Sequence, residues 1–202
     1  MIFPQKKYNS GFDFFSDYVN EKKKILDKID LNKIVTISNI IEKKIKQNKN
    51  IFVCGNGGSA SVANHFLCDF NKGIKSSSKR LLKPRIISLN NSIEAITAIS
   101  NDLSFNEIFS YQLENYANKD DVLITFSCSG KSKNIDKAIN LAKTKKILII
   151  SFVGFLKNNT NKKIDYFLSV NSKNYGICED IFQGIMHMIA QNIRQKFSLK
   201  NL

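Results

Sequence analysis

The chain contains two histidines, and each has a carboxylate at a helical spacing. Asp69 follows His65 by four residues, which places both side chains on one face of a helix. Glu179 precedes His187 by eight residues, about two helical turns, so these side chains also point roughly to one side. Two imidazoles and two carboxylates could ligate a metal ion or act as general acids and bases. A histidine on a helix can also be purely structural, and spacing alone does not separate these readings.

A glycine-rich segment, CGNGGSASVANHF, leads into the first histidine. Gly55, Gly57 and Ala60 fit the G-x-G-x-x-A pattern of dinucleotide-binding loops. Such a site also needs an acidic residue at the end of the next strand, and here that strand runs into NNS at residues 90–92. The sequence therefore disfavours a dinucleotide, and it leaves a sugar-phosphate loop or a plain turn between a strand and a helix.

A second loop, SCSGKS at residues 127–132, ends like a phosphate-binding P-loop. The first glycine of that motif would stand where the chain has Thr125, so the P-loop pattern fails. Both loops nevertheless come directly before an expected helix, whose free N–H groups favour an anion. Ser127, Ser129 and Ser132 could surround one phosphate, although the same serines could merely cap a helix and fill a turn.

The elements that must position these residues alternate along the chain. Apolar residues at three- and four-residue spacing predict two amphipathic helices, at 11–28 and 32–47. Further strands are expected at 50–54, 85–89, 121–127, 146–151 and 166–170, and further helices at 59–70, 91–100, 105–117, 132–143 and 176–197. Apolar strands separated by helices indicate an α/β fold whose parallel sheet is covered on both faces, with ligands at the carboxyl ends of the strands. The polar and basic segment 71–84 is expected to be a mobile loop near the site.

Length, hydrophobic content, cysteine pattern and net charge limit the classes of protein to which the chain can belong. With 202 residues, of which 43% are hydrophobic, the chain can bury one core. No apolar run is long enough to cross a bilayer and the first residues lack a signal-peptide pattern, so we expect a cytoplasmic protein without a membrane partner. The four cysteines form no CxxC pair, which indicates reduced core residues. The formal net charge is +14, but the lysines are scattered, so we expect anionic metabolites and not nucleic acid as partners.

Four segments together resemble the phosphoheptose isomerases, which carry a sugar isomerase (SIS) domain. They are CGNGGSASVANHF (54–66), ISNDLSFNEIFSYQLE (99–114), ITFSCSGKSKN (124–134) and EDIFQGIMHMIAQ (179–191). The resemblance covers most of the chain and implies a three-layer α-β-α sandwich around a parallel five-stranded sheet. It further implies an N-terminal helical segment at 1–48, an SIS domain at 49–202, and a homotetramer in which the N-terminal helices pack and the sites lie at subunit interfaces.

The resemblance also implies roles for individual residues. The substrate would contact Asn56, Gly57, Gly58, Asn101, Asp102 and Glu179, and the phosphate would bind to Ser127, Cys128, Ser129 and Ser132. A zinc ion or an acid/base cluster would lie at His65, Asp69, Glu179 and His187.

Three of these positions depart from the family's usual residues. Asp69 stands where the family usually has Glu, and its shorter side chain changes the reach of a general base and the geometry of a metal site. Glu179 stands where the family usually has Gln, which adds a negative charge that would favour a cation or raise the pKa of a neighbouring carboxyl. Cys128 stands at a position often held by Thr, where its backbone N–H could still bind phosphate.

The expected function is the isomerisation of D-sedoheptulose 7-phosphate to D-glycero-D-manno-heptose 7-phosphate for surface polysaccharide, in capsule or lipopolysaccharide. Asp69 would move a proton between neighbouring carbons through a cis-enediol, and His187 would move the proton between the two oxygens. Two alternatives stay open. One is a non-catalytic SIS tetramer that binds a phosphosugar or a bacterial replication initiator, and the other is an isomerase of another sugar phosphate.

Overall fold

Five parallel strands form the centre of the molecule. The computed structural model describes residues 3–155 and 164–198. Its strands are β1 (Asn50–Gly55), β2 (Arg85–Ser88), β3 (Val122–Ser127), β4 (Leu148–Val153) and β5 (Tyr166–Ser169). They are ordered β2-β1-β3-β4-β5, and every neighbouring pair is parallel. The strand order reverses between β1 and β3, and open α/β sheets bind ligands at the carboxyl ends of the strands at such a switch point.

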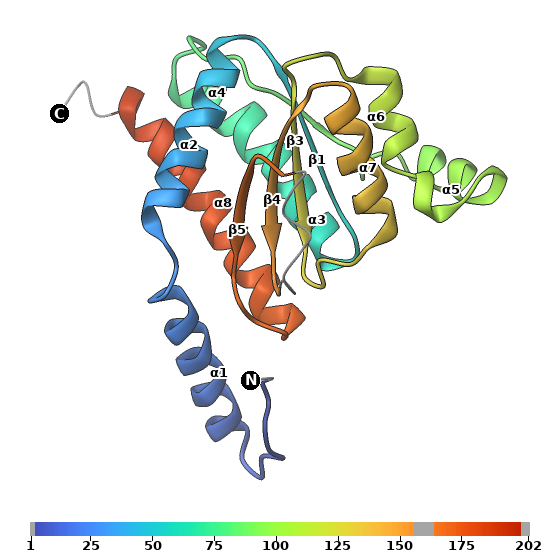
Figure 1. Ribbon diagram of the computed structural model, residues 1–202. Coiled ribbons are helices and arrows are strands. Elements are labelled where there is room, and N and C mark those ends of the chain that lie inside the picture. Colours follow the sequence, from blue (N-terminus) through green and yellow to red (C-terminus); the bar gives the residue numbers. More distant parts are fainter. Residues whose placement is uncertain (1–2, 156–163, 199–202) are drawn as a thin grey trace.

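Helices cover both faces of the sheet (Figure 1). One face carries α2 (Leu31–Lys46), α3 (Gly58–Cys68) and α8 (Tyr175–Ser198), and the other carries α5 (Ile93–Asp102), α6 (Ser110–Tyr116) and α7 (Lys133–Thr144). Successive strand residues alternate between the two cores, because Ile51 and Val53 pack on the α8 side whereas Phe52 and Cys54 pack on the α7 side. The expected three-layer α-β-α sandwich with a parallel five-stranded sheet is thereby confirmed.

The first helix, α1 (Gly11–Leu26), is 16 residues long and yet buries none of its residues. It projects away from the rest of the molecule, and the described N-terminal residues fold back along it (Figure 1). We call α1 together with residues 3–10 the limb. Helix α2 instead buries Ile34, Ile37, Ile41 and Ile45 in the same core as the sheet. A domain boundary between residues 48 and 49 stays a prediction.

The segment 71–84 is not the mobile loop that its polar composition predicts. A π-helix, η1 (Asp69–Ile74), and a short α4 (Lys75–Ser77) occupy its first half. Ile74 and Leu82 are buried in the core, and the Asn71 side chain binds both the N–H and the carbonyl of Ile86 in β2, at 2.9 Å each. These few inward-facing residues hold the segment against the sheet. None of the helices in the described ranges combines the length and hydropathy needed to span a membrane.

Candidate active site

The glycine-rich loop is shaped by two glycines at the carboxyl end of β1. Gly57 caps α3 with φ 57° and ψ −128°, a backbone conformation that side-chain-bearing residues avoid. Gly58 begins the helix beneath the carboxylate of Glu179, and a Cβ at this position would overlap that carboxylate. The loop therefore brings α3 and α8 into direct contact at their N-terminal ends.

Two asparagines that were not singled out in the sequence hold this loop in place. Asn90 accepts a hydrogen bond from the Gly55 N–H at 3.1 Å and donates one to the Gly55 carbonyl at 2.9 Å. Asn134 and Asn56 exchange two side-chain hydrogen bonds, both of 2.9 Å. Asn90 follows β2 and Asn134 lies in the first turn of α7. Their place at the carboxyl edge of the sheet is the signal that could have identified them.

The serine loop joins the end of β3 to α7. The Ser127 hydroxyl accepts a hydrogen bond from the Gly130 N–H at 3.1 Å, and the Ser129 hydroxyl accepts one from the Lys131 N–H at 3.2 Å. Ser132 is the N-cap of α7, yet its side chain makes no capping bond. Serine hydroxyls that only accept keep their own O–H to donate. The serines thus shape the turn and still have donors for an anion.

A cavity of about 120 Å³ lies between the two loops. Its lining residues are Asn56, Ser59, Phe126, Ser127, Cys128, Ser129, Ser132, Tyr175 and Glu179. One liquid water takes up about 30 Å³, whereas pockets for whole small molecules have volumes of about 300 Å³ or more. The cavity therefore has room for a phosphoryl group and not for a complete sugar phosphate.

Glu179 and Cys128 form the floor of this cavity. The Ser59 hydroxyl donates to Glu179 Oε1 at 3.3 Å, and the Cys128 thiol lies 3.7 Å from the same oxygen. A hydrogen bond with Cys178, together with burial, raises the pKa of the Cys128 thiol well above its ordinary range. Cys128 therefore stays a neutral thiol and adds no negative charge to the cavity.

Both histidines and Asp69 converge further along the same two helices. The Nε2 atoms of His65 and His187 lie 3.1 Å apart. Asp69 Oδ1 lies 3.4 Å from the His65 Nε2, and Asp69 Oδ2 lies 3.4 Å from the His187 Nε2. His65 and Asp69 come from the end of α3 and the start of η1, and His187 comes from α8. The i, i+4 pairing predicted for His65 and Asp69 is confirmed.

This three-residue cluster fits a zinc ion. Zinc binds histidine nitrogen and carboxylate oxygen at about 2.0–2.2 Å with tetrahedral geometry, which sets neighbouring ligand atoms about 3.3–3.5 Å apart. The separations of 3.1 and 3.4 Å among His65, Asp69 and His187 are close to those values. One ligand atom from each residue lies within 4.8 Å of the others.

Glu179, the fourth residue expected in this cluster, is not among those that the described structure groups there. Its carboxylate points to Ser59 and Cys128 in the serine-loop cavity. The reason is the rise of a helix, because eight residues separate Glu179 from His187 by about 12 Å along α8. Glu179 thus lines the expected phosphate site, and its added negative charge acts there.

Asn101 and Asp102 lie apart from both the cavity and the cluster. They form the exposed C-terminal end of α5, where the Asn101 amide donates to Asp102 at 2.8 Å. In Figure 1, α5 stands on the opposite side of the molecule from α8. Within one chain the structure does not bring these two residues to the other expected substrate contacts.

The cavity and the cluster are two ends of one site. Six residues separate Ser59 from His65 on α3, which corresponds to a rise of about 9 Å. Helices α3 and α8 lie side by side and both begin at the carboxyl edge of the sheet. An extended molecule with an anion at one end can thus place its other end at the histidines.

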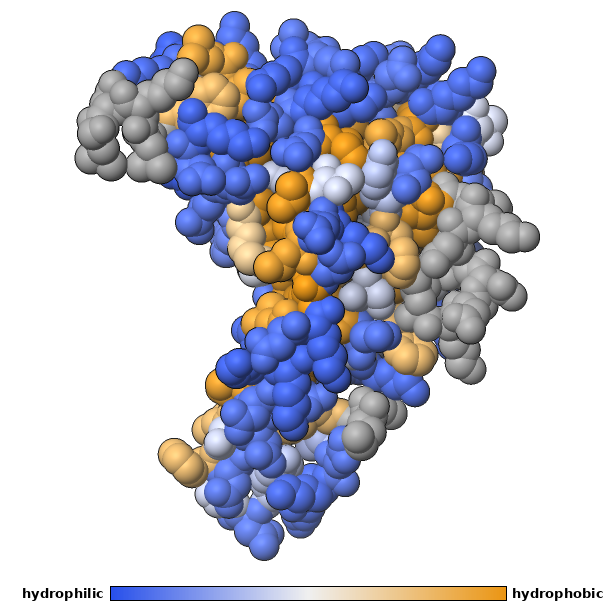
Figure 2. Space-filling view, turned by 60° about the vertical axis from the view of Figure 1, so that its left-hand side comes forward, coloured by the Kyte–Doolittle hydropathy of each residue, from blue (hydrophilic) through white to orange (hydrophobic). Residues whose placement is uncertain are grey.

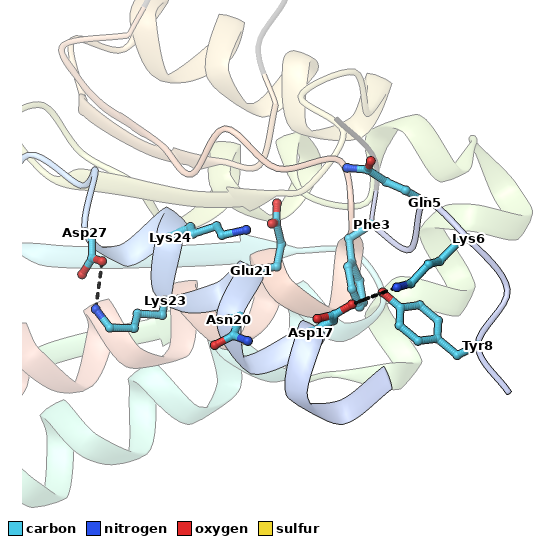
Figure 3. Close-up of a pocket in the computed structure, with 10 residues that line it drawn as sticks. All are labelled: Phe3, Gln5, Lys6, Tyr8, Asp17, Asn20, Glu21, Lys23, Lys24 and Asp27. Carbon is cyan, nitrogen blue, oxygen red and sulfur yellow. Dashed lines mark hydrogen bonds and ion pairs between the residues drawn. The ribbon is translucent and has the colours of Figure 1, made fainter. Parts of the chain in front are cut away.

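A larger groove of about 590 Å³ lies on the limb, away from these residues (Figure 3). Several of its charged and polar lining side chains pair with one another. Tyr8 donates to Asp17 at 2.7 Å, Lys6 lies 3.7 Å from Asp17, and Lys23 pairs with Asp27 at 3.0 Å. Because opposite charges already neutralise each other there, the groove offers no counterpart to the serine loop or the histidines.

The chain is similar to known proteins over most of its length. A family model for the SIS domain matches residues 15–154. The probable phosphoheptose isomerase of Thermoplasma acidophilum is 32% identical over 180 residues, covering 89% of this chain and 97% of that protein. The phosphoheptose isomerase of Helicobacter pylori is 37% identical over 162 residues, covering 80% and 82%.

A solved structure agrees with these relatives. The phosphoheptose isomerase from Francisella tularensis superposes with a TM-score of 0.77 at 25% sequence identity, covering 92% of this chain and 99% of that one. The fold, the serine loop and the histidine cluster therefore occur in a chain that belongs to the phosphoheptose isomerase family of SIS-domain proteins.

Proposed function

We propose that this protein is an aldose–ketose isomerase that converts D-sedoheptulose 7-phosphate to D-glycero-D-manno-heptose 7-phosphate for surface polysaccharide. One observation carries the proposal. A phosphate-sized cavity and a carboxylate–histidine cluster lie at the two ends of one pair of helices, in a chain of the phosphoheptose isomerase family. A seven-carbon sugar with a phosphate at one end and a carbonyl near the other suits that separation.

The proposed reaction moves one proton between neighbouring carbons. Asp69 takes the proton from the carbon beside the carbonyl and returns it to the former carbonyl carbon, through a cis-enediol. His187, whose Nε2 lies 3.4 Å from Asp69, moves the second proton between the two oxygens. The serine loop holds the phosphate, so binding energy from the unreactive end of the substrate orients the reacting carbons.

A zinc ion is part of this proposal. His65, Asp69 and His187 would hold it, as their separations allow. A bound zinc ion supplies Lewis-acid polarisation of a carbonyl oxygen. Since the His187 Nε2 cannot bind a metal and carry a mobile proton at once, removal of the metal tests which role this nitrogen has.

We further propose that the protein works as a homotetramer with sites at subunit interfaces. The cavity in one chain is too small for the whole substrate, and Asn101 and Asp102 lie far from it, so a neighbouring subunit would complete the site. Figure 2 shows apolar surface where the limb joins the rest of the molecule, whereas the upper surface in that view is mostly hydrophilic. Apolar surface of this kind is available for contact with another subunit. A cytoplasmic location would suit a phosphorylated substrate, because charged groups cross bilayers poorly.

The test incubates the purified protein with a panel of ketose phosphates that includes sedoheptulose 7-phosphate. Aldose formation is followed by NMR with and without a chelator, and Asp69→Asn serves as the control for the chemical step. We expect turnover of sedoheptulose 7-phosphate by the wild type, and loss of turnover in Asp69→Asn while binding of the sugar phosphate stays measurable. Wild-type inactivity on every ketose, with binding intact, would favour a non-catalytic binding protein. Preference for a different ketose would identify another sugar-phosphate isomerase.

A further inference from the structure

Two cysteine thiols lie in contact beside the serine-loop cavity, and neither thiol takes part in the proposed reaction. Cys128 directly follows β3, and Cys178 lies in the first turn of α8. A hydrogen bond joins their side chains, and both are free thiols. Two sulfur atoms that share a hydrogen bond need to approach by only roughly 1–2 Å to reach the disulfide bond length of about 2.05 Å.

The backbone around Gly154 holds the two cysteines beside each other. The Gly154 N–H donates to the Ser127 carbonyl at 3.0 Å, and the Gly154 carbonyl accepts from the Ser172 N–H at 3.0 Å. A Cβ at position 154 would lie 2.7 Å from the Cys178 sulfur and 3.0 Å from the Cys128 Cα, so both cysteines border the space that this glycine leaves open. The Cys178 thiol also donates to the Ser172 carbonyl at 3.2 Å. Hydrogen-bonded backbone at the carboxyl edge of the sheet thus keeps the thiols together.

Of the two thiols, Cys128 is the one that faces the cavity. Cys128 is 6% exposed and belongs to the cavity lining, whereas Cys178 is 0% exposed. The cavity volume of about 120 Å³ corresponds to about four liquid waters at about 30 Å³ each. Hydrogen peroxide, which is little larger than water, fits that space, whereas a peptide disulfide such as oxidised glutathione does not.

We propose that a peroxide oxidises Cys128 and Cys178 to a disulfide, and that this disulfide reversibly weakens the binding of phosphate. The Cys128 sulfur attacks one peroxide oxygen, the O–O bond breaks, and the thiol proton leaves with the other oxygen as water. The Cys178 sulfur then attacks the sulfur of the resulting sulfenic acid, the S–O bond breaks, and the Cys178 proton leaves in a second water. Two thiols are thereby oxidised, and one peroxide is reduced to two waters.

The disulfide would act on phosphate through the serine loop. The Cys128 sulfur lies 3.6 Å from the Ser59 hydroxyl and 3.7 Å from a Glu179 carboxylate oxygen, and a bond to Cys178 would draw it away from both. Cys128 is part of the serine loop, so its movement displaces the neighbouring donors, and hydrogen bonds weaken steeply when their geometry is lost. This effect rests on the proposed phosphate site, whereas formation of the disulfide does not.

The test compares the wild type with Cys178→Ser and Cys68→Ser. Cys68 is exposed and lies outside the pair, so Cys68→Ser is the matched control for the same chemical change. Each protein is incubated for hours with excess hydrogen peroxide, because a neutral thiol reacts slowly, and the peroxide is then removed. Free thiols are blocked in denaturant, and mass spectrometry of unreduced peptides maps the disulfides. Calorimetry with inorganic phosphate is done before oxidation, after it, and after treatment with dithiothreitol. Far-UV circular dichroism confirms that each variant is folded.

We expect the wild type and Cys68→Ser to give peptides linked through Cys128 and Cys178, lighter than the two free peptides by two hydrogen atoms. Phosphate binding should weaken about tenfold, the scale of losing one hydrogen bond to a charged group, and dithiothreitol should restore it. Cys178→Ser should give no linked peptide, and before oxidation it should bind phosphate within about twofold of the wild type.

Two results would overturn the proposal in different ways. Absence of the linked peptide from the oxidised wild type would show that Cys128 and Cys178 do not form the disulfide. A linked protein that binds phosphate as tightly as the reduced one would show that the disulfide has no effect on the anion site. If the reduced wild type binds no phosphate, the proposed phosphate site and the effect on it fail together, while the linked peptide still decides whether the disulfide forms.

Discussion

Glu179 is the one acidic residue in the lining of the serine-loop cavity. Its carboxylate lies beside Ser59 and Cys128 in the cavity that we assign to phosphate. A full negative charge there opposes a phosphate dianion. The neutral Cys128 thiol and the serine hydroxyls do not add to that repulsion, so Glu179 is the main unfavourable charge in the cavity lining.

We therefore predict that Glu179→Gln binds inorganic phosphate more tightly than the wild type. Two unit charges about 4 Å apart in water repel by about 1 kcal/mol, which corresponds to roughly fivefold in affinity. The measurement is isothermal titration calorimetry with inorganic phosphate at pH 8, where the dianion predominates. Ser132→Ala, which removes a hydroxyl from the lining, should act in the opposite direction. Weaker phosphate binding in Glu179→Gln would show that the carboxylate helps the anion site.

The sequence predicted these residues to different degrees. His65 and Asp69 are four residues apart on one helix, and local geometry alone brings them together. The meeting of His187 with His65 depends on how α8 packs against α3, which no local pattern encodes. The role of Glu179 in the metal set stays a prediction, since a spacing of eight keeps a rough direction but moves the side chain about two turns along the helix.

At the scale of elements, the site depends on α3 and α8 keeping their relative position. Helix α8 is held on its other side by α2, where Glu42 is buried among apolar residues. The Glu42 carboxylate accepts hydrogen bonds from Lys196 of α8 at 2.5 Å and from Lys46 at 2.6 Å. Burial alone would raise the pKa of Glu42, but the bonds from Lys196 and Lys46 outweigh it, and the pKa lies below its ordinary value.

We predict that this ion-pair group makes stability depend on pH. A carboxyl whose pKa is lowered on folding stabilises the protein above its unfolded pKa, about 4.5 for Glu, and the contribution is lost as the pH falls through the folded value. Glu42→Gln should lower the free energy of unfolding at pH 7 by roughly 1 kcal/mol and should flatten its decline below pH 4.5. Urea unfolding at several pH values measures both effects, with the exposed Glu114→Gln as control. An unchanged slope in Glu42→Gln would assign the acid sensitivity to other carboxylates.

The elements themselves were mostly predictable, and the exceptions have physical causes. Apolar runs gave all five strands, although β4 begins at Leu148 and not at 146, because Lys146 adopts a positive φ of 59° that ends the preceding turn. The segment 71–84 was misjudged because most of its side chains are polar or basic. Its order comes from a few inward residues, such as Ile74, and from the hydrogen bonds of Asn71 to β2, which composition does not reveal.

At the scale of the whole molecule, the limb carries large apolar side chains that no contact within one chain covers. One side of α1 is closed by an aromatic cluster in which Phe14 and Tyr18 pack against Phe3. The other side carries Phe12 and Phe15, which are 80% and 68% exposed, and Val19, which is 63% exposed. These three follow each other at spacings of three and four residues, so they form one stripe. Contiguous apolar surface of this kind marks an interface.

We predict that Phe15→Glu dissociates the proposed tetramer. Burying a phenylalanine side chain contributes about 1.5–3 kcal/mol, and a buried unpaired glutamate would add a further penalty, so each interface should weaken by at least about tenfold. Multi-angle light scattering coupled to size-exclusion chromatography should find a tetramer for the wild type and a smaller species for the variant. Isomerase activity should fall with the loss of the neighbouring subunit, whereas the intramolecular metal site should keep its affinity. Leu81→Glu, an equally drastic change at a 76%-exposed position away from the limb, should leave the assembly intact. A tetrameric Phe15→Glu protein would show that the stripe on α1 is not the contact, and a monomeric but fully active wild type would show that one chain holds the whole site.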